Sequence, residues 1–208
     1  MSASSPLNGT NGVSDQNALA QIELHKALAP RYAYRYSFEF SRLFQQDWHS
    51  EMISHVPSDS KHILDLGCGT GLSGEALQRA GFQEIDGYDF SEGMLALARK
   101  KECYRTLVHV DLAQPDSIPD RGYRHAVLAG VLHHTHAPPE TLAQTLARLP
   151  QEGCIVFSLN DETLRFPEYT DYISNLVDSG QVAVVSQEYG QHLPGRDVGA
   201  RVYVLRKC

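Results

Sequence analysis

The feature that most constrains this chain is a glycine-rich turn between a short apolar run and an amphipathic one. Residues 62–66 have the composition of a buried strand, and the segment Asp65-Leu66-Gly67-Cys68-Gly69-Thr70-Gly71 leads from it into a helix expected over residues 73–80. Glycines adopt backbone angles that other residues avoid, and they let a ligand approach the backbone closely. In open α/β sheets, ligands bind beyond the carboxyl ends of the strands. The turn therefore predicts a ligand site at the end of this strand.

Downstream of the turn, short apolar segments alternate with amphipathic ones, which indicates strands and helices in turn. Further strands are expected at residues 83–89, 105–110, 123–129 and 153–158, and helices near 91–101, 139–149 and 169–179. Residues 182–188 and 201–205 are expected to pair as an antiparallel hairpin. This order predicts an α/β fold with a doubly wound, Rossmann-like sheet. The sheet should be mostly parallel with an antiparallel C-terminal strand, and helices should cover both faces.

An acidic residue completes the expected site. Asp89 ends the second expected strand, 22 positions after Gly67. A carboxylate at this place can accept hydrogen bonds from both ribose hydroxyls of an adenosine. The turn and this carboxylate together predict a ligand that contains adenosine.

The glycine spacing and Asp65 distinguish between two such ligands. A dinucleotide fingerprint reads G-x-G-x-x-G, but counting from Gly67 places Leu72 at the third glycine position. Asp65 would also repel a pyrophosphate, whereas a carboxylate attracts the sulfonium and ammonium groups of S-adenosyl-L-methionine. We therefore expect S-adenosyl-L-methionine as the cofactor, and a nucleotide-dependent oxidoreductase is the disfavoured rival.

Over roughly residues 60–160 the chain resembles the class I S-adenosylmethionine-dependent methyltransferase superfamily. Besides the glycine turn, the resemblance is carried by Gly87-Tyr88-Asp89-Phe90-Ser91 with Met94, by Val110-Asp111-Leu112, and by Gly130-Val131-Leu132-His133-His134. It implies a methyltransferase whose donor-binding residues are Tyr32, Asp65, Gly67, Cys68, Gly69, Gly71, Asp89, Phe90, Met94, Asp111, Leu112 and Gly130. Asp111 is the residue that the resemblance assigns to the adenine amino group.

Other segments are similar to the small methyltransferase-like family of the Williams–Beuren syndrome region and its bacterial relatives. They are Asn160-Asp161, Tyr169 and residues 176–182 and 202–207. This resemblance places Tyr32 in an N-terminal helix that helps to cover the donor. Ala33 stands where that family usually has Asp.

We expect a single methyltransferase domain over residues 16–208, with lid helices at 16–58 and a donor-binding core at 59–208. Residues 1–15 are rich in Ser, Asn and Gly and are expected to form a disordered tail. The aromatic residues between Tyr32 and Phe44 fit either a helix packed on the sheet or a lid over the donor.

His133 and His134 are the candidate catalytic residues, because they follow the fourth strand near the expected methyl group. A general base is required only if the accepting atom carries a proton that must leave, and one of two adjacent histidines at most would serve. A metal site on residues 133–136 is disfavoured, since no fitting carboxylate or cysteine cluster is evident. We therefore expect no metal.

Charge and cysteine content exclude several classes of protein. The chain has 18 basic and 25 acidic residues, a net charge of −7, so nucleic acid is not an expected partner. Its four cysteines form no C-x-x-C pair, which argues against a disulfide framework. Neither a secretory signal nor a membrane-spanning apolar run is visible, so the expected location is cytoplasmic.

The expected function is methyl transfer to a small-molecule acceptor, at an O, N or C atom. The alternative is a protein that binds S-adenosylmethionine without methylating, either a cyclase or a regulatory partner. The sequence makes no prediction about oligomeric state.

Overall fold

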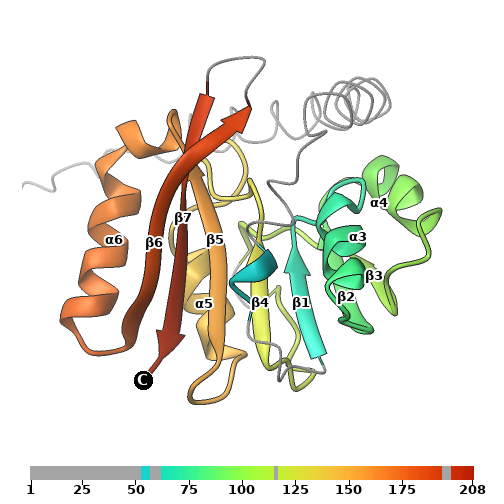
Figure 1. Cartoon of the computed structure of the whole chain (residues 1–208), viewed down its shortest axis with the longest axis horizontal. Helices are drawn as coiled ribbons and strands as arrows, with labels where there is room; N and C mark the ends of the chain where they lie inside the picture. Colours follow the sequence, from blue (N-terminus) through green and yellow to red (C-terminus); the bar gives the residue numbers. More distant parts are fainter. Residues whose placement is uncertain (1–52, 57–61, 115–116, 194–197) are drawn as a thin grey trace, which may run out of the picture.

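The computed structural model describes residues 53–56, 62–114, 117–193 and 198–208. In this part of the chain, seven strands form one sheet in the order β3-β2-β1-β4-β5-β7-β6 (Figure 1). The strands are β1 (His62–Leu66), β2 (Glu84–Asp89), β3 (Thr106–His109), β4 (His125–Leu128), β5 (Cys154–Asn160), β6 (Val182–Leu193) and β7 (Val198–Lys207).

The sheet is parallel from β3 to β5, and β7 is antiparallel to both of its neighbours. This arrangement confirms the predicted Rossmann-like sheet with its antiparallel C-terminal strand, and the predicted terminal hairpin. The hairpin is longer than expected, because β6 continues to Leu193 with register shifts at Val184/Ser186 and Gln191/Leu193. Residues 187–190 of this edge strand are exposed, and they lack the apolar alternation that marks a strand in sequence.

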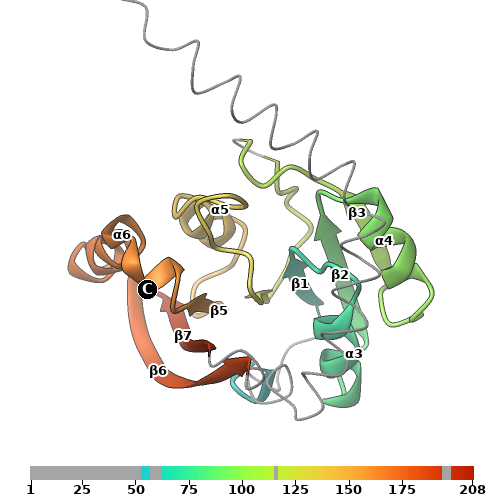
Figure 2. The same cartoon turned by 90° about the horizontal axis from the view of Figure 1, so that it is seen from above.

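Helices lie on both faces of the sheet, as predicted. Figure 2 shows α3 (Leu72–Arg79) and α4 (Glu92–Arg99) on one side, and α5 (Thr141–Ala147) and α6 (Pro167–Asp178) on the other. Successive strand residues alternate between the two layers. Ile63 packs with Leu77 of α3, and Leu64 belongs to the cluster that includes α5 and α6. Among the described residues, no helix has the length and apolarity needed to cross a bilayer.

The strand order reverses at β1, which has β2 on one side and β4 on the other. Parallel strands end at the same edge of a sheet, and ligands bind in the crevice where the order reverses. The segments that follow β1, β2, β4 and β5 therefore lie at one edge. They contain the glycine turn, Asp89, the histidine pair and the residues after Asn160.

Candidate functional site

The turn that leaves β1 has a backbone that favours glycine. Gly67, Gly69 and Gly71 have φ angles of +66°, +54° and +85°, in the left-handed region. The amides of Gly67 and Cys68 both donate to the carbonyl oxygen of Tyr88, at 2.7 and 3.0 Å. The turn is therefore fixed against the end of β2.

Gly67 and Gly69 differ in what surrounds them. A Cβ atom at Gly67 would lie 3.0 Å from Val131 Cγ1 and closer still to Cγ2, so the turn packs directly on the loop after β4. A Cβ atom at Gly69 would have no described atom within 4 Å. The turn is thus closed toward β4 at Gly67 and open at Gly69, where a ligand can reach it.

Asp89 is held beside this open position by two backbone amides. Its Oδ2 accepts from Gly69 at 2.9 Å and its Oδ1 from Ser91 at 2.8 Å. Ser91 is also the N-cap of α4, and its hydroxyl accepts from the Met94 amide at 3.3 Å. Burial raises the pKa of Asp89, and the two amide hydrogen bonds oppose that effect. Each carboxylate oxygen keeps a free lone pair, so Asp89 can accept hydrogen bonds from a ligand.

Asp65 is fully buried beneath the turn, and one of its two carboxylate oxygens accepts hydrogen bonds from described residues. Its Oδ2 accepts from Ser73 Oγ at 2.6 Å and from Tyr104 OH at 2.7 Å. Its Oδ1 has no hydrogen-bond partner among the described residues. Burial raises its pKa to about 6, the two hydroxyls oppose this, and the charge of Asp89 adds to it. The turn is thus flanked by two carboxylates that repel one another.

Tyr104 belongs to this site although the sequence analysis did not identify it. Besides donating to Asp65, its hydroxyl accepts from the Gly74 amide at 3.1 Å. Its ring occupies the space that side chains at Gly74 and Gly87 would need. A single tyrosine between a helix and a strand has no distinguishing pattern, so local sequence offers no signal for this role.

Cys68 is buried, and burial followed by the charges of Asp65 and Asp89 raises the pKa of its thiol. A protonated, buried thiol is a packing group and not a nucleophile. The side chain of Cys68, one of the expected donor-binding residues, therefore packs inside the protein.

The residues expected near the adenine lie at the ends of β2 and β3. Phe90 packs against His109 with ring centroids 5.5 Å apart, and Met94 lies in the first turn of α4. Asp111 follows β3, and its carboxylate accepts from the Ala113 amide at 3.0 Å. The side chain of Leu112 is buried in the core, so the backbone of Leu112 is the part left to meet a ligand.

The loop after β4 carries Gly130 and the two histidines. The Gly130 amide donates to Ser158 Oγ at 3.0 Å, which ties the start of the loop to β5. Burial, and then the charge of His134, lower the pKa of His133. The rings of His133 and His134 have centroids 4.1 Å apart, so the structure brings the two expected catalytic residues together.

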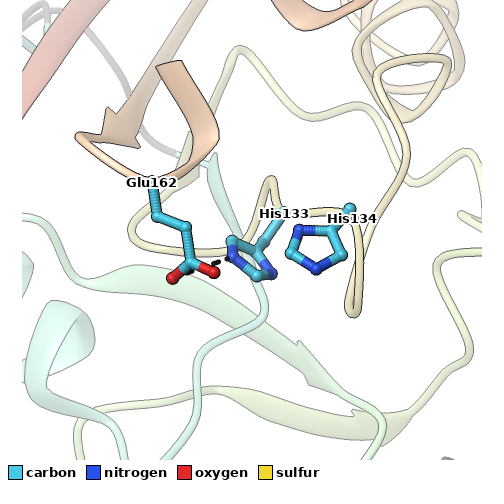
Figure 3. Close-up of side chains that lie close together, drawn as sticks. All are labelled: His133, His134 and Glu162. Atoms are coloured by element: carbon cyan, nitrogen blue, oxygen red, sulfur yellow. Dashed lines mark ion pairs between the residues drawn. The ribbon is translucent and has the colours of Figure 1, made fainter. Parts of the chain in front are cut away.

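A carboxylate that the sequence analysis missed lies beside this pair. Glu162 follows β5, and its Oε2 is 3.5 Å from His133 Nε2 (Figure 3). The premise that no carboxylate accompanies the histidines is therefore wrong. The signal available in the sequence was the acidic pair Asp161-Glu162 directly after the fifth expected strand.

The structure does not describe the expected tail at residues 1–15. Of the expected lid it describes residues 53–56 alone, so Tyr32 also lies outside the described residues. Of the short described piece of the lid, Ile53 and Val56 are buried against the apolar layer that includes Leu77 and Ile85.

Comparison with known proteins gives a family match for the central part of the chain. Residues 63–153 match the family described as a methyltransferase domain. Trans-aconitate 2-methyltransferase of Delftia acidovorans is 38% identical over 102 residues, which are 46% of this chain and 38% of that protein. Methyltransferase-like protein 27 of Homo sapiens is 30% identical over 114 residues, which are 54% of this chain and 46% of that protein. The chain thus spans less than half the length of these curated relatives.

The fold is that of solved methyltransferases. The structure of a TehB-like SAM-dependent methyltransferase from Corynebacterium glutamicum superposes with a TM-score of 0.64 at 20% identity, covering 86% of this chain and all of that one. Residues 63–153 thus match a methyltransferase domain, and the described part of the chain has the fold of a solved SAM-dependent methyltransferase. The family match and the fold agree with the methyltransferase superfamily and the cofactor class predicted from the sequence.

Proposed function

We propose that this chain transfers a methyl group from S-adenosylmethionine to a small-molecule acceptor. The observation that carries the proposal is the pair of carboxylates flanking the glycine turn. The pKa values of Asp65 and Asp89 are both raised, by burial first, and the charge of Asp89 contributes to the shift of Asp65. Such a site attracts a cation and repels a pyrophosphate. It therefore favours a sulfonium and ammonium ligand over a dinucleotide.

The residues present fit this ligand. The buried Oδ1 of Asp65, which has no partner in the described part of the chain, can accept from an ammonium group. The amides of the turn can meet the ligand's carboxylate, and Asp89 can accept from its ribose hydroxyls. Phe90 or Met94 on one side and the Asp111 loop on the other would enclose the adenine. Gly130, at the adjacent end of β4, closes the proposed site.

The bound donor supplies a methyl group on a sulfonium, which is already a good leaving group. The contribution required from the chain is alignment of the acceptor and exclusion of water. His133 and His134 are proposed to act on the acceptor, since they follow β4, whose neighbour β1 ends in the glycine turn. Val131 supports this placement, because it packs on Gly67 two residues before His133.

A small acceptor is favoured because, among the described residues, no additional domain is inserted after β4 or β5. The segments between β4 and α5 and between β5 and α6 are residues 129–140 and 161–166. The relatives' names do not settle the acceptor, because their similarity falls on less than half of their length. Lid helices over residues 16–58, a disordered tail over 1–15 and the cytoplasmic location stay proposals. Membership of the small methyltransferase-like family of the Williams–Beuren region likewise rests on the sequence resemblance.

Calorimetric titration of S-adenosylmethionine and S-adenosylhomocysteine into the purified chain tests the donor site. Micromolar binding of both ligands supports the proposal, and screening of acceptors would then follow. Binding without turnover on any acceptor would favour the non-methylating alternative. Heat from NADH and none from either sulfur compound would overturn the assignment.

Asp65→Asn is expected to weaken binding of S-adenosylmethionine about tenfold without lowering the stability of the protein. The carboxyl of Asp65 has an ordinary pKa of 3.8 and a folded value of about 6. Because the folded state holds this proton more tightly, its ionisation destabilises the protein as pH rises through that interval, and the cost persists at neutral pH. Asn removes this cost while its carbonyl can still accept from Ser73 or Tyr104. Calorimetry and thermal unfolding at neutral pH check both parts, and unchanged affinity would remove Asp65 from the donor site.

A further inference from the structure

Three side chains that can bind a metal ion meet at the ends of β4 and β5. His133, His134 and Glu162 each offer one nitrogen or oxygen atom, and these atoms all lie within 4.8 Å of one another. Figure 3 shows the ring of His133 between the carboxylate of Glu162 and the ring of His134. The 3.5 Å between His133 Nε2 and Glu162 Oε2 is close to the separation of two ligands that share an ion about 2 Å from each.

The two segments that supply these ligands are joined by buried hydrogen bonds. Thr163 Oγ1 donates to the carbonyl oxygen of Leu132 at 3.2 Å, and Tyr169 OH donates to that of Ala137 at 3.1 Å. Within the loop after β4, the His133 amide donates to the carbonyl oxygen of Ala137 at 3.2 Å. Thr163 and Tyr169 are almost fully buried, so water does not compete for these bonds. The histidine loop and the Glu162 segment are thus held in one relative position.

The ring of His133 is oriented with Nε2 toward Glu162. Its Nδ1 lies 2.8 Å from Thr135 Oγ1, and histidines that bind metals commonly donate their other N–H to such an acceptor. The opposite tautomer would accept from the Thr135 amide at 3.3 Å, so a bound metal would select the first arrangement.

We propose that His133, His134 and Glu162 form a binding site for a divalent transition-metal ion of the Zn²⁺ type. Two imidazoles and one carboxylate are a known ligand set of zinc sites that leave a coordination position open. His134 and Glu162 are exposed, so this position can face an incoming molecule. The assignment gives the histidine pair a role other than the proton acceptor expected from the sequence.

The use of such a site rests on the proposed function. A metal at the end of β4 would neighbour the glycine turn that follows β1. An oxygen of the acceptor bound to the metal would lose its proton more easily, because the metal stabilises the anion. The substrate class implied is a small molecule with a hydroxyl or carboxyl group that can coordinate a metal.

The test is metal binding by the full chain with no methyl donor present. After removal of metals with a chelator, Zn²⁺ is titrated against a competing indicator, and Co²⁺ is added to record its visible d–d spectrum. Glu162→Gln and His133→Gln are expected to weaken Zn²⁺ binding at least 100-fold, because even an outer-sphere partner contributes about 10- to 100-fold. His136→Gln is the matched control, since His136 is an exposed imidazole on the same loop and outside the group.

Tight Zn²⁺ binding that His136→Gln retains and the other two variants lose supports the site. A Co²⁺ spectrum with thiolate-to-metal charge transfer would assign the ion to a cysteine, such as the exposed Cys208, and would overturn the proposal. Equal Zn²⁺ affinity in all variants would also overturn it. Because the donor is absent, these outcomes are independent of donor binding. If the chain bound Zn²⁺ but failed to bind S-adenosylmethionine, the proposed function would be refuted and the metal site would stand.

Discussion

Replacing Asp89 with alanine is expected to weaken binding of S-adenosylmethionine on the order of 100-fold. The carboxylate would accept from two ribose hydroxyls, and hydrogen bonds to charged groups contribute roughly 1.5–3 kcal/mol each. Its Oδ2 also positions the Gly69 amide, at 2.9 Å. Calorimetric titration of S-adenosylmethionine into wild type and variant measures the loss directly.

Ser91→Ala separates the loss of the carboxylate from a general loosening of the turn. Ser91 caps α4 through the hydrogen bond from Met94, and loss of such a cap costs about 1 kcal/mol of stability. The donor affinity of this control should stay within about threefold of wild type, since Asp89 remains. An Asp89→Ala variant that binds the donor like wild type would place the ribose elsewhere.

The donor side of the site could be predicted because its signals are short and local. The glycine turn and Asp89 each follow a strand directly, and parallel strands bring the carboxyl ends of β1 and β2 together. These parts depend only on the strand–helix alternation being assigned correctly.

Glu162 and Tyr104 could not be predicted in the same way, because their roles depend on tertiary contacts. Glu162 meets His133 only because β4 and β5 are neighbours and a buried hydrogen bond from Thr163 fixes the segment after β5. Tyr104 lies against Gly74 of α3 and Gly87 of β2, and it reaches Asp65 from 39 positions away in the chain. The Tyr104 contact leaves no periodic or compositional mark in the sequence. The acidic pair Asp161-Glu162 after the fifth expected strand is visible there, but it does not identify His133 as its partner.

Gly67→Ala is expected to destabilise the protein by roughly 2–5 kcal/mol, and the cause can be divided experimentally. A φ of +66° costs a residue with a Cβ atom about 1–2 kcal/mol. Crowding against Val131 adds about 1–3 kcal/mol, as for other overpacked sites. Gly69→Ala is the matched control, because Gly69 has a φ of +54° and a Cβ atom there would have no described atom within 4 Å. The Gly69→Ala variant should lose only the part of the unfolding free energy that the positive φ accounts for.

The double variant Gly67→Ala/Val131→Ala tests whether the donor turn and the histidine loop are in direct contact. Val131→Ala removes both Cγ atoms that the new Cβ would meet, so the two changes together should cost at least about 1 kcal/mol less than their sum. Denaturant unfolding of the two single variants, the double variant and Gly69→Ala provides the comparison. Additive costs, or equal costs at Gly67 and Gly69, would mean that the turn does not pack on Val131. A favourable coupling would mean that a displacement of the donor turn is transmitted to the loop that carries His133.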